Sequence, residues 1–301
     1  MKNLVNQTIS KAKLPIGVFD SGVGGFTVAR EIASQLPQES IIYFGDTLRC
    51  PYGPRSLSEV AIYVEEIAAW LSREQVKLIV IACNSATAAG LEIAQRSFDV
   101  PVIGVIEPGA RAAVQATQSR RVGVIGTVAT IESGAYTRSI RGLDAGITVF
   151  SAATPRFVEM VEQGLRLDRN PIEDLMAQTA SIYIRPAFQE IARDYLNPLR
   201  RCHIDTLVLG CTHYPLLMPL IRSVMGSGVQ IISSAEETAR DVADALRRRG
   251  QLEDASEIAC YRFATTAKEP QEFVALGSAI FQRPIDNLTI VTLDELAKLR
   301  R

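Results

Sequence analysis

The chain has 301 residues, of which 47% are hydrophobic and 22% are charged, and its formal net charge is −1. This length and composition predict an ordinary globular protein with a sizeable core and room for about two domains. The balanced charge argues against a strongly basic nucleic-acid-binding protein. The densest basic cluster, at 247–249, ends an expected helix, where cations complement the helix dipole. We therefore expect no nucleic-acid partner.

The apolar runs and the cysteines indicate where the protein resides. Residues 1–14 are polar and hold no apolar segment of a signal peptide. The apolar runs are far shorter than the ~20 residues that cross a bilayer. Five cysteines, an odd number without the close pairs of a zinc site, fit a reducing compartment better than a disulfide scaffold. We expect a soluble, cytoplasmic protein with no membrane partner.

Short runs rich in Val, Ile and Leu recur along the chain and predict β-strands. Because they are nearly continuous in apolar residues, they are typical of strands buried on both faces of a parallel sheet. Between them, apolar residues at i, i+3 and i+4 over 57–71 predict a helix with one buried face. Alternating strands and helices indicate an α/β fold with helices on both sides of mostly parallel sheets. The expected strands are 16–19, 41–44, 78–82, 102–105, 122–125, 147–150, 206–209 and 229–232.

Two pairs of segments resemble each other across the chain. "GVFDSG" at 17–22 resembles "GVIGTV" at 123–128, and "LIVIACNSATA" at 78–88 resembles "VLGCTHYPLL" at 208–217. We interpret this as two pseudo-symmetric α/β domains of similar design. In parallel sheets, ligand sites collect at the carboxyl ends of strands. All four segments carry polar residues there, which predicts an active site in the cleft between the domains.

Each member of the second pair ends its apolar run with a cysteine. Cys83 precedes Asn84 and Ser85, either of which could cap a following helix. A thiol at a helix start is close to the positive end of the dipole, which favours the thiolate. Cys211 follows Gly210 and precedes a helix start. If the two halves face each other, both thiols reach one cleft.

Two thiols across a small ligand are suited to the inversion of a stereocentre that bears a hydrogen. One group removes the proton from one face while the other returns a proton to the opposite face, and the roles exchange for the reverse reaction. Buried structural cysteines, a zinc site and a redox pair are the competing interpretations. Neither cysteine has a C-x-x-C partner, and His213 is only two residues from Cys211, so we expect no metal.

Asp20 ends the first expected strand and precedes a glycine-rich loop. The small glycines of "GVFDSGVGG" would let backbone N–H groups approach an anionic ligand. A dinucleotide loop is a weaker interpretation, because G-x-G-x-x-G is not matched. An ordinary strand-to-helix turn stays open.

Hydroxyl and amide groups at strand ends and helix starts could hold the carboxylates of a ligand. The loop "CPYGPR" at 50–55 could close over such a site. Any single member of the polar group could equally be a helix cap. The group consists of Ser21, Asn84, Ser85, Thr127, Thr130 and Thr212.

Six ordered motifs give the chain a resemblance to a known family. They are "GVFDSGVGGFTV", "YFGDTLRCPYGPR", "VIACNSATA", "PVIGVIEPGARAA", "GVIGTVATIESGAY" and "LVLGCTHYPLL". Together they resemble glutamate racemase, the cofactor-independent enzyme that makes D-glutamate for peptidoglycan. The resemblance runs from about residue 15 to the "FATTAKEPQEF" segment and so covers most of the chain.

The resemblance implies roles for individual residues. Cys83 and Cys211 match the two acid/base thiols, the first acting on D-glutamate and the second on L-glutamate. Asp20 matches the carboxylate beside the first thiol, and His213 the imidazole beside the second. Glu162 matches a carboxylate that assists the second thiol, although Glu159 lies one helical turn earlier and makes this register the least secure. The implied substrate contacts are Asp20, Ser21, Pro51, Tyr52, Gly53, Cys83, Asn84, Ser85, Thr127, Thr130, Cys211, Thr212 and His213.

The resemblance also implies an organisation and partners. The first domain is discontinuous, made of 15–107 plus 221–301, and the second domain is 108–220. Residues 1–14 form an N-terminal extension outside the match, which we expect to be disordered or loosely attached. The implied partners are glutamate and a second copy of the chain in a homodimer, with no cofactor.

Two alternatives are kept open beside this interpretation. One is a related racemase or isomerase that acts on aspartate, hydantoins or maleate. The other, from a different class, is a carboxylate-binding protein that has kept the fold without catalysis. Cys50, Cys202, Cys260 and His203 have no evident partner in the sequence, and we interpret them as structural, loop or exposed residues.

Overall fold

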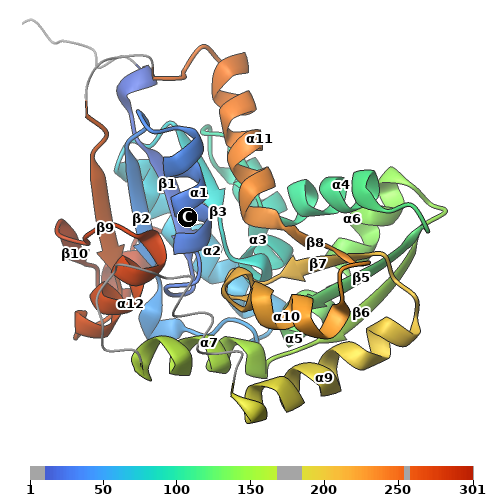
Figure 1. Ribbon diagram of the computed structural model, residues 1–301. Helices are drawn as coiled ribbons and strands as arrows, with labels where there is room; N and C mark the ends of the chain where they lie inside the picture. The colour runs from blue at the N-terminus through green and yellow to red at the C-terminus, as the bar shows by residue number, and fades with distance from the viewer. Residues whose placement is uncertain (1–10, 168–184, 254–257, 301) are drawn as a thin grey trace, which may run out of the picture.

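Two parallel sheets form the framework of the protein in the computed structural model, which describes residues 11–167, 185–253 and 258–300. The six-stranded sheet has the order β10-β9-β2-β1-β3-β4, and the four-stranded sheet has the order β6-β5-β7-β8. Figure 1 shows the first sheet on the left and the second on the right. The strands are β1 (Ile16–Asp20), β2 (Ile41–Gly45), β3 (Leu78–Ile81), β4 (Val102–Gly104), β5 (Arg121–Gly126), β6 (Thr148–Ala153), β7 (Thr206–Gly210), β8 (Gln230–Ser233), β9 (Tyr261–Thr265) and β10 (Leu288–Ile290).

The two sheets share one topology. The order β2-β1-β3-β4 around β1 is repeated as β6-β5-β7-β8 around β5, with parallel pairing throughout. The central strands β1, β3 and β7 are buried at every position, as their continuous apolar runs predict. The prediction of two pseudo-symmetric, mostly parallel α/β halves is thus confirmed.

Helices cover both faces of the sheets. An apolar cluster packs α2 and α3 on one face of the first sheet, and α1 and α12 lie on the other face. Between the sheets, α11 packs on both α1 and α4, which joins the two halves (Figure 1). The helices are α1 (Phe26–Gln35), α2 (Leu57–Arg73), α3 (Asn84–Ser97), α4 (Ile106–Ala116), α5 (Val128–Glu132), α6 (Ala135–Leu143), α7 (Arg156–Leu167), α9 (Pro186–Arg201), α10 (Met218–Met225), α11 (Ser234–Arg248), α12 (Gln271–Phe281) and α13 (Leu293–Ala297), with 3-10 turns at Lys11–Lys13, Thr47–Arg49 and Tyr214–Leu217.

All eight expected strands are present, with shifts of one to three residues at some ends. Two further strands, β9 and β10, were not predicted. β9 contains Arg262 among its five residues, and β10 has only three residues that are largely exposed, so neither forms a continuous apolar run. Both extend the first sheet beyond β2.

The predicted domain limits differ from the sheets at one point. β8 follows residue 220, where the second domain was expected to end, yet it pairs with β7 in the second sheet. The division into domains otherwise stays a prediction. Residues 1–10 of the predicted N-terminal extension lie outside the described residues. The described part is ordered, because Lys11–Lys13 forms a 3-10 turn and Ala12 accepts a hydrogen bond from Lys77.

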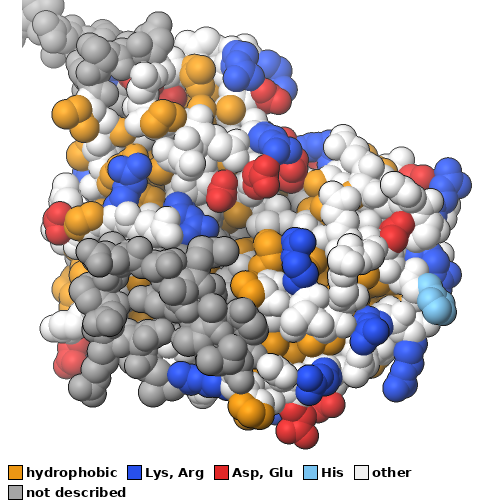
Figure 2. All heavy atoms as spheres, viewed as in Figure 1, with side chains coloured by type: hydrophobic (Ala, Val, Ile, Leu, Met, Phe, Trp, Pro, Cys, Tyr) orange, Lys and Arg blue, Asp and Glu red, His pale blue; other side chains and the backbone are white. Residues whose placement is uncertain are grey.

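The surface and the helices bear on the predicted partners. Figure 2 shows acidic and basic side chains interspersed on the visible face rather than gathered by sign. Within the described ranges, no helix combines the length and the apolar character needed to cross a membrane.

Candidate active site

The two predicted acid/base cysteines lie at equivalent places in the two sheets. Cys83 follows the end of β3 by two residues, and Cys211 directly follows β7. Both residues are 7% exposed, and both line one small cavity at the carboxyl ends of the strands. The full lining is Ser21, Cys50, Pro51, Tyr52, Gly53, Cys83, Asn84, Ser85, Thr127, Val158, Gly210, Cys211, Thr212 and His213.

Cys83 is the N-cap residue of α3, whereas the sequence offered Asn84 or Ser85 as the cap; both of these lie in the first turn of the helix. The predicted preference for a thiolate at this helix start is wrong, however. Burial and then the charge of Asp20 raise the pKa of Cys83 well above its ordinary value, and the backbone N–H of Ala86 offsets only part of this. The desolvation cost exceeds the effect of the helix N-terminus, so Cys83 is a thiol at neutral pH in this environment.

Cys211 lies beside an imidazole and a carboxylate. His213 Nδ1 is 3.9 Å from Cys211 Sγ, and His213 Nε2 is 3.4 Å from Glu162 Oε1 on α7. Burial alone would lower the pKa of His213, but hydrogen bonds to Cys211 and Glu162 and their charges raise it to about 10. The His213 side chain is therefore an imidazolium at neutral pH, held between the sulfur and the carboxylate.

Asp20 lies behind the cavity wall and links the two halves. Its Oδ1 accepts hydrogen bonds from the Gly22 N–H at 2.9 Å and the Ser21 hydroxyl at 3.3 Å, and its Oδ2 accepts one from Thr212 Oγ1 at 3.1 Å. Burial raises the pKa of Asp20, and the charge of His213 and these hydrogen bonds offset part of the rise. Asp20 thus contacts the loop after β7 while its charge acts on Cys83.

The glycines after Asp20 serve the close approach of two loops. A Cβ at Gly24 would lie 2.4 Å from Thr212 Oγ1 and 2.5 Å from the His213 ring. A Cβ at Gly25 would lie 2.4 Å from Asp20 Cβ. Packing therefore accounts for the absence of side chains at Gly24 and Gly25, and the interpretation that the glycines open the backbone to an anionic ligand stays a prediction. Without side chains here, the loop that follows β1 can touch the loop that follows β7.

Hydroxyl groups meet where the halves join. Ser85 Oγ is 2.9 Å from Thr127 Oγ1 and 3.2 Å from Thr130 Oγ1. The Ala129 N–H donates to the Gly53 carbonyl at 2.9 Å, so the loop after β2 also reaches the second half. Thr130 is buried behind Ser85 and Thr127 and does not line the cavity itself, in contrast to the prediction that it contacts a ligand directly.

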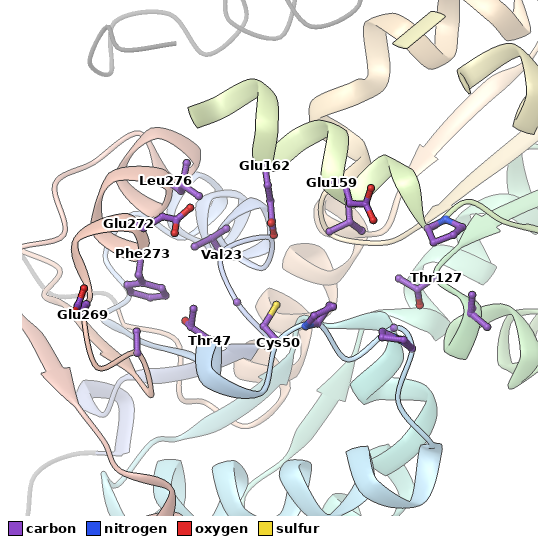
Figure 3. A pocket seen from close by; sticks show the side chains of 18 residues that line it. Val23, Thr47, Cys50, Thr127, Glu159, Glu162, Glu269, Glu272, Phe273 and Leu276 are labelled. Carbon is purple, nitrogen blue, oxygen red and sulfur yellow. The ribbon is translucent and has the colours of Figure 1, made fainter. Parts of the chain in front are cut away.

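A larger pocket of about 540 Å³ adjoins the cavity, and both include Cys50, Gly53 and Thr127 in their lining. Figure 3 shows Glu162 pointing from α7 into this pocket, with Phe273 and Leu276 on α12 at its other side. Glu159 and Glu162 both line it. Because Glu162 is the member of the pair at ion-pair distance from His213, it is the stronger candidate to act on Cys211.

The cavity brings most of the predicted site residues together. Eleven of them line it directly, whereas Asp20 and Thr130 lie just behind the lining and Glu162 lines the adjoining pocket. Cys50 was interpreted as a loop residue, yet it lines both spaces, and burial raises its pKa to about 12. Val158 and Gly210 were also missed as lining residues; Gly210 lies inside a motif that the sequence singled out, and Val158 directly precedes Glu159. Among the described residues, no group of three or more His, Cys, Asp or Glu could hold a metal ion.

Comparison with known proteins places the chain among racemases. The family model described as Asp/Glu/Hydantoin racemase matches residues 16–242. The glutamate racemase of Bacillus cereus is 45% identical over 285 residues, which is 95% of this chain and 99% of that protein. The glutamate racemase isoform RacE1 of Bacillus anthracis superposes with a TM-score of 0.82 at 43% identity, covering 93% of this chain and 98% of that one. The glutamate racemase of Francisella tularensis, solved in complex with D-glutamate, gives a TM-score of 0.82 at 33% identity over 94% and 99%.

Proposed function

This chain belongs to the Asp/Glu/hydantoin racemase family and is an amino-acid racemase, and from that premise we propose that it interconverts L-glutamate and D-glutamate without a cofactor. The observation that carries the proposal is the shared cavity of Cys83 and Cys211, which end corresponding strands of the two sheets. Glutamate as the substrate is supported by the relatives, which are named glutamate racemases and cover nearly the whole chain.

The proposed reaction uses the thiols in turn. For D-glutamate, a Cys83 thiolate takes the proton from Cα, and the carbanion takes a proton from the Cys211 thiol on the opposite face. The products are L-glutamate, a Cys83 thiol and a Cys211 thiolate. For L-glutamate the same steps run in reverse, with Cys211 as the base.

The neighbours of the thiols complete the proton balance. Because burial raises the pKa of both Cys83 and Asp20, the Asp20 carboxylate is a suitable acceptor for the Cys83 proton when the substrate binds. On the other side, the His213 imidazolium can return a proton to Cys211, and Glu162 holds the imidazolium in place. We infer that Glu162, rather than Glu159, has this role, because Glu162 Oε1 is 3.4 Å from His213 Nε2.

Neutral donors would hold the two carboxylates of glutamate. The cavity lining provides hydroxyl, amide and backbone N–H groups from residues 50–53, from Ser21 and Thr212 and from the start of α3. A preorganised set of such dipoles also stabilises the negative charge that develops on the carbanion. We propose that these residues, including Pro51, Tyr52, Asn84 and Ser85, form the substrate contacts.

We further propose a cytoplasmic homodimer whose D-glutamate supplies peptidoglycan synthesis. Light scattering of the purified protein tests the dimer, and growth of a D-glutamate-requiring bacterium that carries this chain tests the supply of D-glutamate.

The decisive experiment incubates purified protein with L-glutamate, and separately with D-glutamate, in D₂O without added cofactor. Proton NMR then follows loss of the Cα signal, and chiral analysis identifies the product. Deuterium at Cα together with the opposite enantiomer, from either starting side, is the expected result. Absence of exchange with glutamate, but exchange with aspartate under the same conditions, would reject the proposed substrate and retain the racemase.

A further inference from the structure

The side-chain amide of Asn84 has a hydrogen-bond partner for its oxygen but none for its nitrogen among the described residues. Asn84 is 3% exposed and lines the cavity between the two cysteines. Its Oδ1 accepts a hydrogen bond of 2.8 Å from the Tyr136 hydroxyl. Its Nδ2 is buried and has no hydrogen-bond partner among the residues that the structure describes. A buried amide N–H₂ without a partner is costly, so a ligand in the cavity that accepts from it gains binding energy.

The partner of Asn84 comes from the other half of the molecule. Tyr136 is the second residue of α6, is 2% exposed and lies 52 positions from Asn84 in the sequence. Burial raises the pKa of Tyr136, and the side chain of Ser234, at the start of α11, offsets part of the rise. The Tyr136 hydroxyl donates its proton to Asn84. A donating hydroxyl requires an acceptor at Asn84, which is Oδ1 rather than Nδ2.

We propose that Tyr136 is a positioning residue that fixes the orientation of the Asn84 amide and thereby makes the cavity select a carboxylate over a carboxamide. With Oδ1 held by the hydroxyl, Nδ2 is the amide end left for a ligand, and a carboxylate oxygen is its natural acceptor. The inference rests on the proposed function, because it concerns a carboxylate of glutamate.

The selection works because an amide is nearly symmetric in shape. A rotation of 180° about its terminal bond exchanges Oδ1 and Nδ2 with almost no change in volume, so packing alone does not choose between them. Without the Tyr136 hydroxyl, Asn84 could present Oδ1 to the ligand and accept from an N–H₂ group. Discrimination between acids and amides is therefore expected to depend on a residue that does not line the cavity.

The test compares the unmodified protein with Tyr136→Phe, Asn84→Ala and the double variant. Glutamate is the substrate, and glutamine and isoglutamine, which each replace one carboxylate by a carboxamide, are the competitive inhibitors. In the unmodified protein, the analogue whose carboxamide faces Asn84 should bind at least about 10-fold more weakly than glutamate, because an uncharged amide oxygen is a weaker acceptor for Nδ2 and an N–H₂ group takes the place of the second carboxylate oxygen. In Tyr136→Phe, KM for glutamate should rise about 10-fold with a smaller change in kcat, and the carboxamide penalty should fall by a similar factor.

The controls separate positioning from a structural role. Tyr261→Phe removes a tyrosine hydroxyl in β9, outside the cavity, and should leave KM and the inhibition ratio unchanged. The double variant should behave as Asn84→Ala alone, because the two residues act as one unit. An unchanged carboxamide penalty in folded Tyr136→Phe, or independent losses in the double variant, overturns the inference. If the unmodified protein fails to turn over glutamate, the proposed function fails, and calorimetry of the same three ligands still decides the role of Tyr136.

Discussion

Cys83 and Cys211 end corresponding strands of two sheets with the same topology, but their neighbours have opposite charge. Asp20, a buried carboxyl group, acts on Cys83 and raises its pKa. His213, an imidazolium supported by Glu162, lies beside Cys211. A repeated scaffold thus presents a thiol twice, and the local residues give each thiol a neighbour of different charge. Such a pair suits a reaction in which one thiol gives up a proton while the other receives one.

The other ends of the same two strands differ as well. Lys77 precedes β3 and Asp205 precedes β7, each six positions before the cysteine of its strand. Lys77 Nζ is buried and lies 2.5 Å from Glu39 Oε2, and it donates to the Gln251 carbonyl at 2.9 Å. Asp205 is partly exposed and accepts from two backbone N–H groups after α4. One strand is thus anchored by a buried ion pair and the other by a hydrogen-bonded surface carboxylate.

The largest expected effect comes from replacing either thiol. We expect Cys83→Ser and Cys211→Ser each to reduce racemisation of both enantiomers by at least about 10³-fold, because a hydroxyl is a far weaker acid than a thiol and therefore neither gives up a proton readily nor ionises to a base as a thiol does. Chiral chromatography measures the rate from each side. Cys260→Ser, which alters an exposed cysteine, is the matched control and should keep the unmodified rate. A wild-type rate in either active-site variant would eliminate the two-base mechanism.

The next effect concerns the anchor of the first strand. Lys77→Met leaves the buried Glu39 carboxylate without its cation, and we expect the free energy of unfolding to fall by about 3 kcal/mol. Urea denaturation of the purified variant measures this change.

A double variant distinguishes an unpaired charge from poor packing. Lys77→Met/Glu39→Leu removes both charges and should recover most of the lost stability. If the double variant is no more stable than Lys77→Met, the loss comes from packing or from the hydrogen bonds of Lys77 to Ala12 and Gln251.

A smaller effect should reveal the two different proton partners. Asp20→Asn and His213→Asn are each expected to lower turnover about 100-fold, since each removes one proton acceptor or donor. The two enantiomers have equal free energy, so kcat/KM must be the same in both directions for any variant. The difference between the two proton partners must instead be measured as the kinetic isotope effect on the turnover of α-deuterated D-glutamate and of α-deuterated L-glutamate.

Which enantiomer shows the larger isotope effect depends on which thiol is impaired. In Asp20→Asn, removal of the proton by Cys83 becomes slow, so the effect should be larger with D-glutamate. In His213→Asn, the step at Cys211 becomes slow, and the effect should be larger with L-glutamate. Equal isotope effects from both enantiomers in both variants would contradict separate partners for the two thiols.

The sequence shows the strands and the cysteines because both are local features. Continuous apolar runs predict β1, β3, β5 and β7, and the cysteine at the end of a run predicts a site at the sheet edge. Hydrogen-bond partners are different, because they join distant positions. Thr212 and Asp20 are 192 positions apart, so their contact is not written in any local pattern.

The same reason explains the residues that were missed. Tyr136 lies inside a motif that the sequence singled out, yet its role depends on Asn84, which is far along the chain. The pKa of Cys83 was misjudged because the helix start is visible in the sequence, whereas the burial that outweighs it is not.

The smallest expected effect concerns the anchor of the second strand. Hydrogen bonds from Thr117, Ser119 and Gln118 lower the pKa of Asp205 to about 2, although partial burial opposes this. A lowered carboxyl pKa stabilises the folded state above the ordinary value of 3.8, and this contribution is lost as the pH falls through about 2. With allowance for solvent screening, Asp205→Asn should lower the free energy of unfolding by about 1 kcal/mol at pH 7.

Urea denaturation of both proteins between pH 7 and pH 3 checks the sign, because the difference between them should begin to shrink below about pH 4. Asp99→Asn, at an exposed position, is the matched control and should show no such trend. The difference in the free energy of unfolding between Asp205→Asn and the unmodified protein could instead be as large at pH 3 as at pH 7. That result would mean that Asp205 holds the turn at 117–119 by shape and not by charge. The contrast with the ion pair at Lys77 would then be one of burial alone.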